Sequence, residues 1–505
     1  MERRALLAVV LSVVAIVAWY SLFPPAPPAR LDKGVAPAAQ GEKGVDAPAA
    51  AEAQGGGEAV SGEREEEVVL EGEGFTAVVS NRGGVVRSLK LGKYRDSNGQ
   101  PQELAGEGGE ILAVVPDGPW NRELFRLERV PGGVSLVWAD GRGRRVEKRL
   151  KVAGPYRLEV EGTLWGFGPE AGVVASGRLA TWPGGEGTNR LARADFVLRV
   201  GGKLKRVAAG KAESEGATVA PDFVGAEDQY FVLAFLPKLA AGAKVDGGRA
   251  LVVVGSSGRF AGLLVGAPKE HRLLRELGRG LDETLSFGFF GFLSLLFLEV
   301  LRWIHSWSGN WGVGIILLTA LIRVLLFPLT HKSTVAMRGM AKLQPKIKAI
   351  QERYQERAKK DPAVRQKMNE EIMALYRREG VNPMGGCLPM VVQIPILWAL
   401  YTLFAFAIEL RHQPFFLWIR DLSAKDPTYV TPILMTASMV LQQRLAPQTG
   451  DPAQRRMFML LPFVFGLMFM NFPSGLVLYW LVNNLLTIAQ QLLTERLLRR
   501  ADTTA

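Results

Sequence analysis

The chain has 505 residues, 48% of them hydrophobic, with a formal net charge of +12 and a mean hydropathy of +0.11. Soluble domains rarely combine this apolar content with a positive mean hydropathy, so part of the chain is expected to lie in a membrane. The single cysteine excludes a disulfide framework and cysteine-based metal sites, and the four histidines are widely spaced. We therefore expect no metal and no cofactor.

The N-terminal region predicts a membrane anchor followed by a linker. Residues 1–23 join a basic start to 19 uncharged residues. This run is longer than the ~7–15-residue apolar core of a cleaved signal peptide, which favours an uncleaved transmembrane helix. Arg3 and Arg4 keep its N-terminus in the cytoplasm by the positive-inside rule. Residues 24–63, rich in Pro, Ala and Gly, are expected to be a disordered linker.

Residues 64–280 predict an all-β domain. Short apolar runs at 68–70, 75–79 and 85–91 tend to alternate, and turn signals such as Asn98-Gly99 separate later runs of the same kind. Many short strands with frequent turns are typical of an antiparallel β-sandwich. Over 61–280 there are 32 Lys and Arg against 28 Asp and Glu, which argues against a nucleic-acid-binding surface.

The charge of one later segment decides the membrane topology. Residues 331–380 carry 13 Lys and Arg against six acids, which places them in the cytoplasm. With the β domain outside, only one of the apolar runs 285–304 and 309–330 can then cross the membrane. The first contains Glu299 and Arg302 and ends in tryptophans, so we interpret 284–306 as an amphipathic helix on the outer surface.

The same reasoning assigns the rest of the chain and gives six spans with both termini cytoplasmic. In order these segments are a second transmembrane helix at 309–330, a cytoplasmic helical hairpin at 331–387, a third transmembrane helix at 388–408, an outer loop at 409–427, a fourth transmembrane helix at 428–446, a cytoplasmic loop at 447–456, a fifth transmembrane helix at 457–472, a sixth at 475–494 and a short cytoplasmic tail at 495–505.

The hairpin is predicted from two apolar stripes at helical spacing. The first comprises Met340, Leu343, Ile347, Ile350 and Tyr354, and the second comprises Val364, Met368, Ile372 and Leu375. Between them, Asp361-Pro362 reads as an N-cap followed by proline at the first helical position. The basic residues then face outward, either as a topology signal alone or as a docking surface for anionic lipid or ribosomal RNA. The docking candidates are Lys346, Lys348, Arg353, Arg357, Lys359 and Lys360.

Arg323 is the most informative residue of the spans. A charge near the centre of a transmembrane helix costs roughly 2.5–3.5 kcal/mol on insertion scales. Arg323 either extends to the inner headgroups or lies in a water-accessible cavity, to which Thr319 would add a hydroxyl. Gln393, Asn483 and other polar residues of the predicted spans have two possible roles. They form hydrogen bonds between helices or they belong to a functional site.

Several motifs together resemble the YidC family of bacterial membrane protein insertases. They include Leu343-Gln-Pro-Lys-Ile347, Val381-Asn-Pro-Met-Gly-Gly-Cys-Leu-Pro389, Gln393-Ile-Pro395, Asp421-Leu-Ser-Ala-Lys-Asp-Pro427 and Phe472-Pro-Ser-Gly-Leu-Val-Leu-Tyr479. Within the outer domain, Ser80-Asn-Arg-Gly-Gly84 and Gln229-Tyr-Phe-Val-Leu-Ala-Phe-Leu-Pro237 are similar to the large periplasmic domain of Gram-negative members. The outer side is then the periplasm, the membrane is the bacterial inner membrane, and the β domain is expected to be a supersandwich.

The resemblance implies a five-helix core with a hydrophilic groove open to the cytoplasm and the lipid. The groove residues it implies are Arg323, Thr319, Gln393, Tyr479 and Trp480. It also implies that the third and fifth spans contact the substrate, for which the candidates are Met390, Leu397, Met459, Phe463 and Met468.

The function expected is insertion of membrane proteins without nucleotide hydrolysis, not an enzymatic reaction. The partners expected are nascent membrane proteins, the Sec translocon, anionic lipids and the ribosome, the last through the hairpin and the loop 447–456 because few residues follow 494. The protein is expected to work as a monomer. A secondary transporter of a small anion and a passive assembly scaffold are the alternatives.

Overall fold

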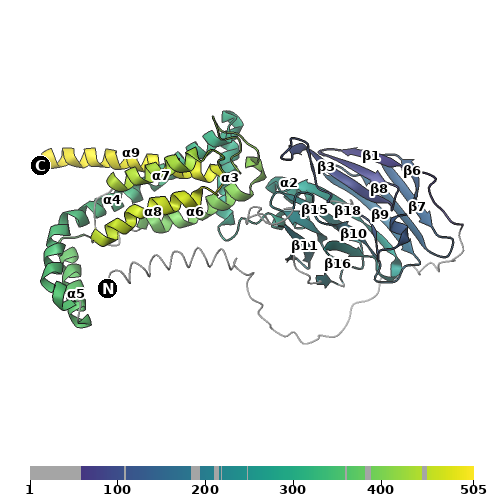
Figure 1. Cartoon of the computed structure of the whole chain (residues 1–505), viewed down its shortest axis with the longest axis horizontal. Coiled ribbons are helices and arrows are strands. Elements are labelled where there is room, and N and C mark those ends of the chain that lie inside the picture. The colour runs from purple at the N-terminus through teal and green to yellow at the C-terminus, as the bar shows by residue number, and fades with distance from the viewer. Residues whose placement is uncertain are drawn as a thin grey trace. The chain divides into compact units, whose positions relative to one another are not determined.

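The computed structural model describes residues 58–106, 110–182, 194–209, 215–217, 219–246, 248–358, 361–381, 388–445 and 452–504. These residues form two compact units (Figure 1). The β unit runs to Ser286 and also includes Phe406–Ile408, and the helical unit comprises Phe287–Ala405 and the residues from Glu409 onward. The predicted anchor at 1–23 and most of the predicted linker at 24–63 lie outside the described residues.

The described strands of the β unit form three sheets with antiparallel pairing throughout. The first sheet consists, in spatial order, of β1 (Glu67–Gly72), β2 (Phe75–Ser80), β3 (Val85–Arg95) and β4 (Pro101–Glu103). The second sheet consists of β13 (Glu215–Ala217), β16 (Gly242–Asp246), β17 (Arg249–Val253), β10 (Gly172–Ser176) and β5 (Val114–Val115). The third sheet consists of β12 (Lys203–Ala208), β11 (Ala194–Val200), β14 (Phe223–Asp228), β15 (Phe231–Leu239), β18 (Arg259–Pro268), β9 (Arg157–Trp165), β8 (Arg145–Val152), β7 (Gly133–Ala139) and β6 (Arg126–Val130).

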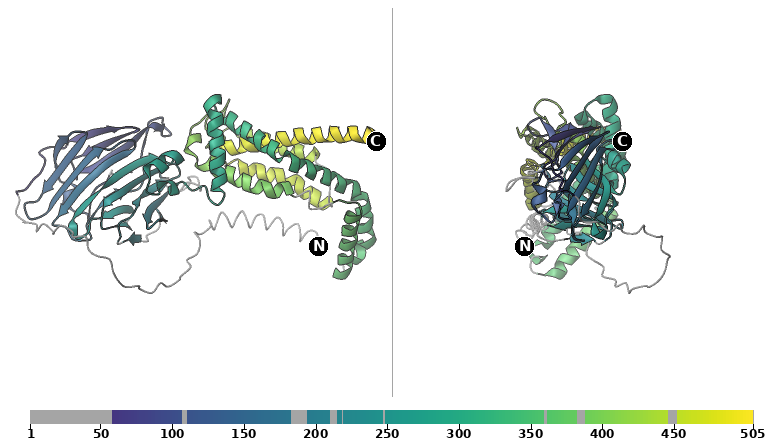
Figure 2. Two further views of the ribbon diagram at one scale, coloured as in Figure 1. Left: turned by 180° about the vertical axis from the view of Figure 1, so that it is seen from behind. Right: turned by 90° about the vertical axis from the view of Figure 1, so that its right-hand side faces the viewer.

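Both smaller sheets pack against the nine-stranded sheet, in the layers visible in Figure 2. The predicted antiparallel β-sandwich is therefore confirmed. Alternation predicted the half-buried strands, such as β1, in which Val68 and Leu70 are buried and Val69 is exposed. It did not single out β14, because every residue of this strand is buried and no alternation remains.

The Ser80–Gly84 motif forms the turn between β2 and β3. The Asn81 side chain accepts a hydrogen bond from the Glu66 amide at 2.8 Å and donates to the Arg64 carbonyl at 2.8 Å. Gly83 and Gly84 take φ values of 70° and 58°, and a Cβ at Gly83 would lie 2.5 Å from the Asn121 carbonyl oxygen. Glycine is required here because a side chain would be both strained and obstructed.

This turn also holds a buried lysine of β8. Lys148 is 1% exposed, and its ammonium donates to the carbonyl oxygens of Gly83, Gly84 and Leu112 at 3.2, 2.8 and 2.7 Å. It lies 5.2 Å from the centre of the Phe125 ring. The carbonyls favour the ammonium, but burial disfavours the charge and lowers the pKa of Lys148 to about 7.

We expect Lys148 to make the stability of the β unit rise with pH above neutrality. Its pKa in the unfolded chain is about 10.4, so between about pH 7 and 10 the unfolded chain binds more protons than the folded one. The free energy of unfolding should then rise by up to about 1.4 kcal/mol per pH unit. Urea titrations of the full chain in detergent, followed by circular dichroism, measure this rise, and Lys148→Met should make the slope of stability against pH smaller. An equal slope in both proteins would contradict the assignment.

Two short helices follow the strands, α2 (His271–Leu277) and η3 (Leu281–Thr284). The helices of the helical unit are α3 (Gly291–Ser308), α4 (Trp311–Ala358), α5 (Pro362–Arg378), α6 (Leu388–Phe406), α7 (Val430–Leu445), α8 (Pro452–Phe469) and α9 (Ser474–Thr504) (Figure 1).

The helix α8 starts at Pro452 rather than 457, and three further boundaries differ from the sequence-based prediction. The first is at 330, where α4 does not end; it continues as one helix to Ala358, through Pro328 and Pro345. Each proline removes one backbone hydrogen bond but leaves the flanking turns helical. The second is the start of α3, at Gly291 rather than 284, because Gly288 takes a φ of 73° and interrupts any earlier helix. The third is at 494, because α9 continues to Thr504.

Two of the described helices are long and apolar enough to cross a membrane, at Trp311–Tyr354 and Ser474–Thr494. Shorter apolar helices lie at Val391–Phe406 and Phe458–Phe469. The six predicted spans therefore stay a prediction.

The second half of α4 and α5 pack against each other through the predicted stripes. Their buried centre consists of Leu343, Ile347, Ile350 and Leu375, with Tyr354, Met368 and Ile372 at its margin. Asp361 caps α5, accepting a hydrogen bond from the Ala363 amide at 2.8 Å, and Pro362 is its first residue. The expected pair of amphipathic helices and its N-cap are confirmed.

Candidate functional site

Arg323 lies on α4 and contacts α9. Its Nε donates to Asn483 Oδ1 at 2.8 Å, and its Nη2 donates to the Asn483 carbonyl oxygen at 3.3 Å and to Thr487 Oγ1. The neighbouring Val324 and Leu325 are both 70% exposed, whereas Ile322 is buried. Arg323 thus lies at the margin between the packed face and the outward face of α4.

The partners of Arg323 belong to a polar stripe along one face of α9. Tyr479, Asn483, Thr487 and Gln490 follow one another at intervals of four, four and three residues, which places them on one side of a helix. Tyr479 accepts a hydrogen bond from Gln393 of α6 at 2.5 Å. Gln490 donates to Thr330 Oγ1 of α4 at 2.6 Å. The stripe therefore joins three helices around Arg323.

The partners of Arg323 are neutral. No Asp or Glu lies within the spans predicted for the residues after 308, and within the described residues Arg323 forms no ion pair. Asn483 and Thr487 stabilise the guanidinium by hydrogen bonds but leave its charge uncancelled. An uncancelled cation among apolar helices attracts anionic groups strongly, because the surroundings screen it poorly.

Two of the predicted groove residues lie apart from this network. Thr319 is 1% exposed and donates to the Ile315 carbonyl oxygen at 2.6 Å, so its hydroxyl is used within its own helix. The Trp480 ring lies 5.0 Å from Phe469 and 6.1 Å from Phe465 of α8. Adjacent residues point about 100° apart on a helix, which is why Tyr479 contacts α6 while Trp480 contacts α8.

The structure brings into the network two polar residues that sequence analysis did not propose for the groove, Thr487 and Gln490. Their signal is the spacing from Tyr479 and Asn483, which continues the same face of α9 toward its C-terminal end.

The predicted substrate-contact residues differ in exposure. Met459 and Phe463 of α8 are 49% and 55% exposed, while Met468 and Leu397 are partly buried. The side chain of Met390 lies outside the described set. Two of the described candidates are therefore free to contact an apolar helix beside the unit.

The hairpin's docking candidates are exposed and partly paired with its own acids. Lys346 bonds Glu379 at 2.7 Å, Arg353 bonds Glu371 at 2.9 Å, and Lys348 lies 3.8 Å from Glu352. The Arg357 side chain, Lys359 and Lys360 lie outside the described set. Exposed pairs of this kind contribute little to stability and break readily for another anion.

One face of α3 is apolar and exposed. Phe292, Leu296, Trp303 and Trp307 are each more than half exposed, whereas Phe297 and Leu301 of the opposite face are buried. Arg302, one of the charges in this run, pairs with Glu299 at 2.7 Å and with Glu409.

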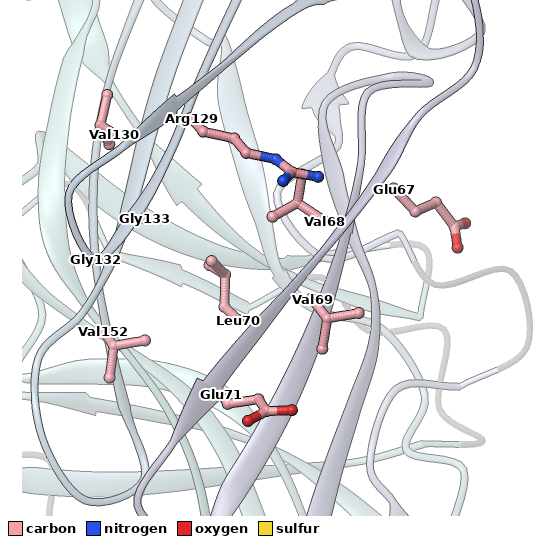
Figure 3. A pocket seen from close by; sticks show the side chains of 10 residues that line it. All are labelled: Glu67, Val68, Val69, Leu70, Glu71, Arg129, Val130, Gly132, Gly133 and Val152. Carbon is pink, nitrogen blue, oxygen red and sulfur yellow. The ribbon is translucent and has the colours of Figure 1, made fainter.

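A groove of about 560 Å³ lies on the β unit between β1 and the β6–β7 turn (Figure 3). Glu67 is paired with Arg87 at 2.8 Å, and Glu67 and Glu71 lie apart from Arg129 across the groove. Its polar groups do not converge on one point, so the Arg323 network is the better candidate site.

The chain combines an apolar helical unit, which contains a polar network, with a β-sandwich unit. This combination is that of a membrane protein with a large domain outside the membrane. Residues 67–300 match the family model described as YidC periplasmic domain, and residues 303–501 match the one described as 60Kd inner membrane protein.

The chain is 36% identical to the membrane protein insertase YidC of Geotalea daltonii over 551 residues, covering 97% of this chain and 98% of the relative. It is 35% identical to that of Geobacter sulfurreducens over 544 residues, covering 99% and 100%. A solved structure described as an active YidC insertase with the first transmembrane domain resolved is 19% identical, covers 85% of this chain and 93% of its own, and has a TM-score of 0.39.

The chain belongs to the YidC family of membrane protein insertases. This is a family of insertases rather than of enzymes, and its periplasmic domain implies location in the inner membrane.

Proposed function

We propose that the Arg323 network receives the segment of a nascent membrane protein that must cross the membrane. The observation that carries the proposal is the uncancelled charge of Arg323 between α4 and α9. An acidic segment is attracted to this charge, and the polar stripe of α9 replaces part of its hydration. Partition of the substrate's apolar helix into lipid then drives release.

The outward faces of the helices support a position in the bilayer. Large apolar side chains are exposed on four helices; they include Leu317, Leu321, Val324 and Leu325 of α4, Val391 and Ile394 of α6, Ile433 and Leu434 of α7, and Leu460, Phe463, Val464 and Leu467 of α8. Such faces are stable against lipid and unstable in water. We further propose six spans with both termini cytoplasmic and α3 at the periplasmic interface, because its exposed tryptophans prefer that layer.

The basic hairpin is proposed to contact anionic lipid or the ribosome. Its net positive charge and exposed Lys346 and Arg353 support this role. Insertion is proposed to proceed alone or with the Sec translocon.

Reconstitution of the purified chain separates insertion from the alternatives. We expect proteoliposomes that contain only this protein to insert a small single-span substrate, measured by protection of the translocated segment from added protease. Protein-free vesicles are the control. Uptake of a small anion without insertion would favour a secondary transporter. Insertion that occurs only after a translocon is added would favour an assembly scaffold.

A further inference from the structure

The loop between α6 and α7 contains a small hairpin. The Leu422 amide donates to the Gln413 carbonyl oxygen at 3.0 Å, and the Phe415 amide donates to the Ile419 carbonyl oxygen at 3.0 Å. The chain therefore reverses its direction at 416–418. Residues 413–422 are called the loop hairpin below, and residues 416 and 417 are its tip.

Both residues of the tip are large, apolar and exposed. Phe416 is 57% exposed and Leu417 is 84% exposed, so Leu417 packs against little within the described residues. Its φ of 55° is a left-handed conformation, which suits glycine and disfavours any residue with a side chain. The turn geometry therefore does not account for a leucine here, and a contact outside the chain would.

The base of the loop hairpin is fixed to the ends of the helices. The Phe415 ring lies so close to Gly312, at the start of α4, that a Cβ at Gly312 would overlap it. At the start of α9, the Gly475 amide donates to the Leu422 carbonyl oxygen at 2.8 Å. The tip is therefore an exposed apolar projection from an anchored base, at the end of the helical unit where α4 and α9 begin.

The exposed charges beside the tip are positive. Over 413–427 the acids are Asp421, which accepts from the Ser423 amide and hydroxyl at 2.8 Å each, and Asp426, which is 1% exposed. Arg420 and Lys425 are exposed. An apolar tip between exposed cations is complementary to a phospholipid surface, because the acyl chains accept the apolar groups and the phosphates attract the cations.

We propose that the loop hairpin is a lipid anchor, in which Phe416 and Leu417 insert into the outer leaflet of the bilayer. The inference rests on the proposed position of the helical unit in the membrane. It adds a point of attachment that lies outside the spans and outside α3. Because the base is fixed to α4 and α9, the anchor would also hold the outer ends of these two helices at a constant depth.

The depth of the tip can be measured by fluorescence quenching in vesicles of phosphatidylethanolamine and phosphatidylglycerol. The single cysteine of the full chain is removed by Cys387→Ala, and a small fluorophore is attached at Leu417→Cys. Lipids brominated on their acyl chains quench from inside the bilayer, and iodide quenches from water. The matched controls are Lys425→Cys, exposed in the same loop, and Leu467→Cys, where the leucine is 66% exposed on α8.

Brominated lipid should quench the label at 417 as strongly as the label at 467, and iodide should quench only the label at 425. Equal quenching by iodide at 417 and 425 would overturn the inference. A label at 417 that is shielded from both quenchers would also overturn it, because a protein surface would then cover the tip. Absence of lipid quenching at 467 would instead refute the proposed position of the helices in the bilayer, so the two failures are distinguishable.

Discussion

Replacement of Arg323 by alanine should lower the insertion of substrates with an acidic translocated segment at least about tenfold, because one charge-assisted contact is lost. Arg323→Lys should retain most of the activity, since it keeps a positive charge in the same place. Protease protection in proteoliposomes, with two substrates that differ only in Asp or Asn in the translocated segment, measures the effect.

The control for Arg323→Ala is Arg444→Ala, which removes an exposed arginine at the end of α7. It should leave insertion of both substrates unchanged. If Arg323→Ala inserted the acidic substrate at the normal rate, attraction by this charge would be excluded for this protein. A similar loss for both substrates, together with a lowered thermal midpoint, would indicate a packing role.

The second large effect is expected in the β unit, where Glu227→Gln should cost about 3–5 kcal/mol of stability. Glu227 is 0% exposed and accepts hydrogen bonds from Lys269 at 2.7 Å and from Arg206 at 2.6 Å. Lys269 is 2% exposed, and burial lowers its pKa against the opposing effect of Glu227. Removal of the carboxylate takes away the counter-charge that is paired directly with the buried Lys269 ammonium.

Hydrogen exchange of β14 and β18 in the full chain measures this loss. The matched control is Glu159→Gln, because Glu159 pairs with Lys238 at 2.7 Å on the exposed surface and should cost less than about 1 kcal/mol. Equal effects of the two substitutions would show that the buried network does not stabilise the β unit. Arg206 also donates to the Glu283 carbonyl oxygen at 3.0 Å, so exchange should also rise in η3.

The hairpin shows what periodicity can predict. Leu343, Ile347, Ile350 and Leu375 were identified as buried because apolar spacing in a helix defines one face, whatever covers it. The Asp361 cap was predictable for a similar reason, since capping depends on residues adjacent in sequence. The length of α4 was not, because a change from apolar to charged residues marks a change of environment and not the end of a helix.

Two features of the structure could not be predicted from the sequence: a strand that is buried on both of its faces, and polar contacts between residues that are distant in sequence. Every residue of β14 is buried, which removes the alternation that identifies a strand. The three carbonyl partners of Lys148 come from a turn and a loop that lie far from it in sequence. No local pattern distinguishes such a lysine from one on the surface.

The sequence by itself determined the class of this protein, because apolar runs, a basic helical hairpin and a β domain of balanced charge are each properties of local composition. That the runs cross the membrane and that the hairpin is cytoplasmic stay predictions. The sequence also identified Arg323 as the charge to explain. Only the tertiary structure determined which groups Arg323 contacts. Asn483 lies 160 residues away in sequence, and its hydrogen bond with Arg323 depends on how α4 packs against α9. Partners that distant are selected by helix packing, which composition and spacing do not encode.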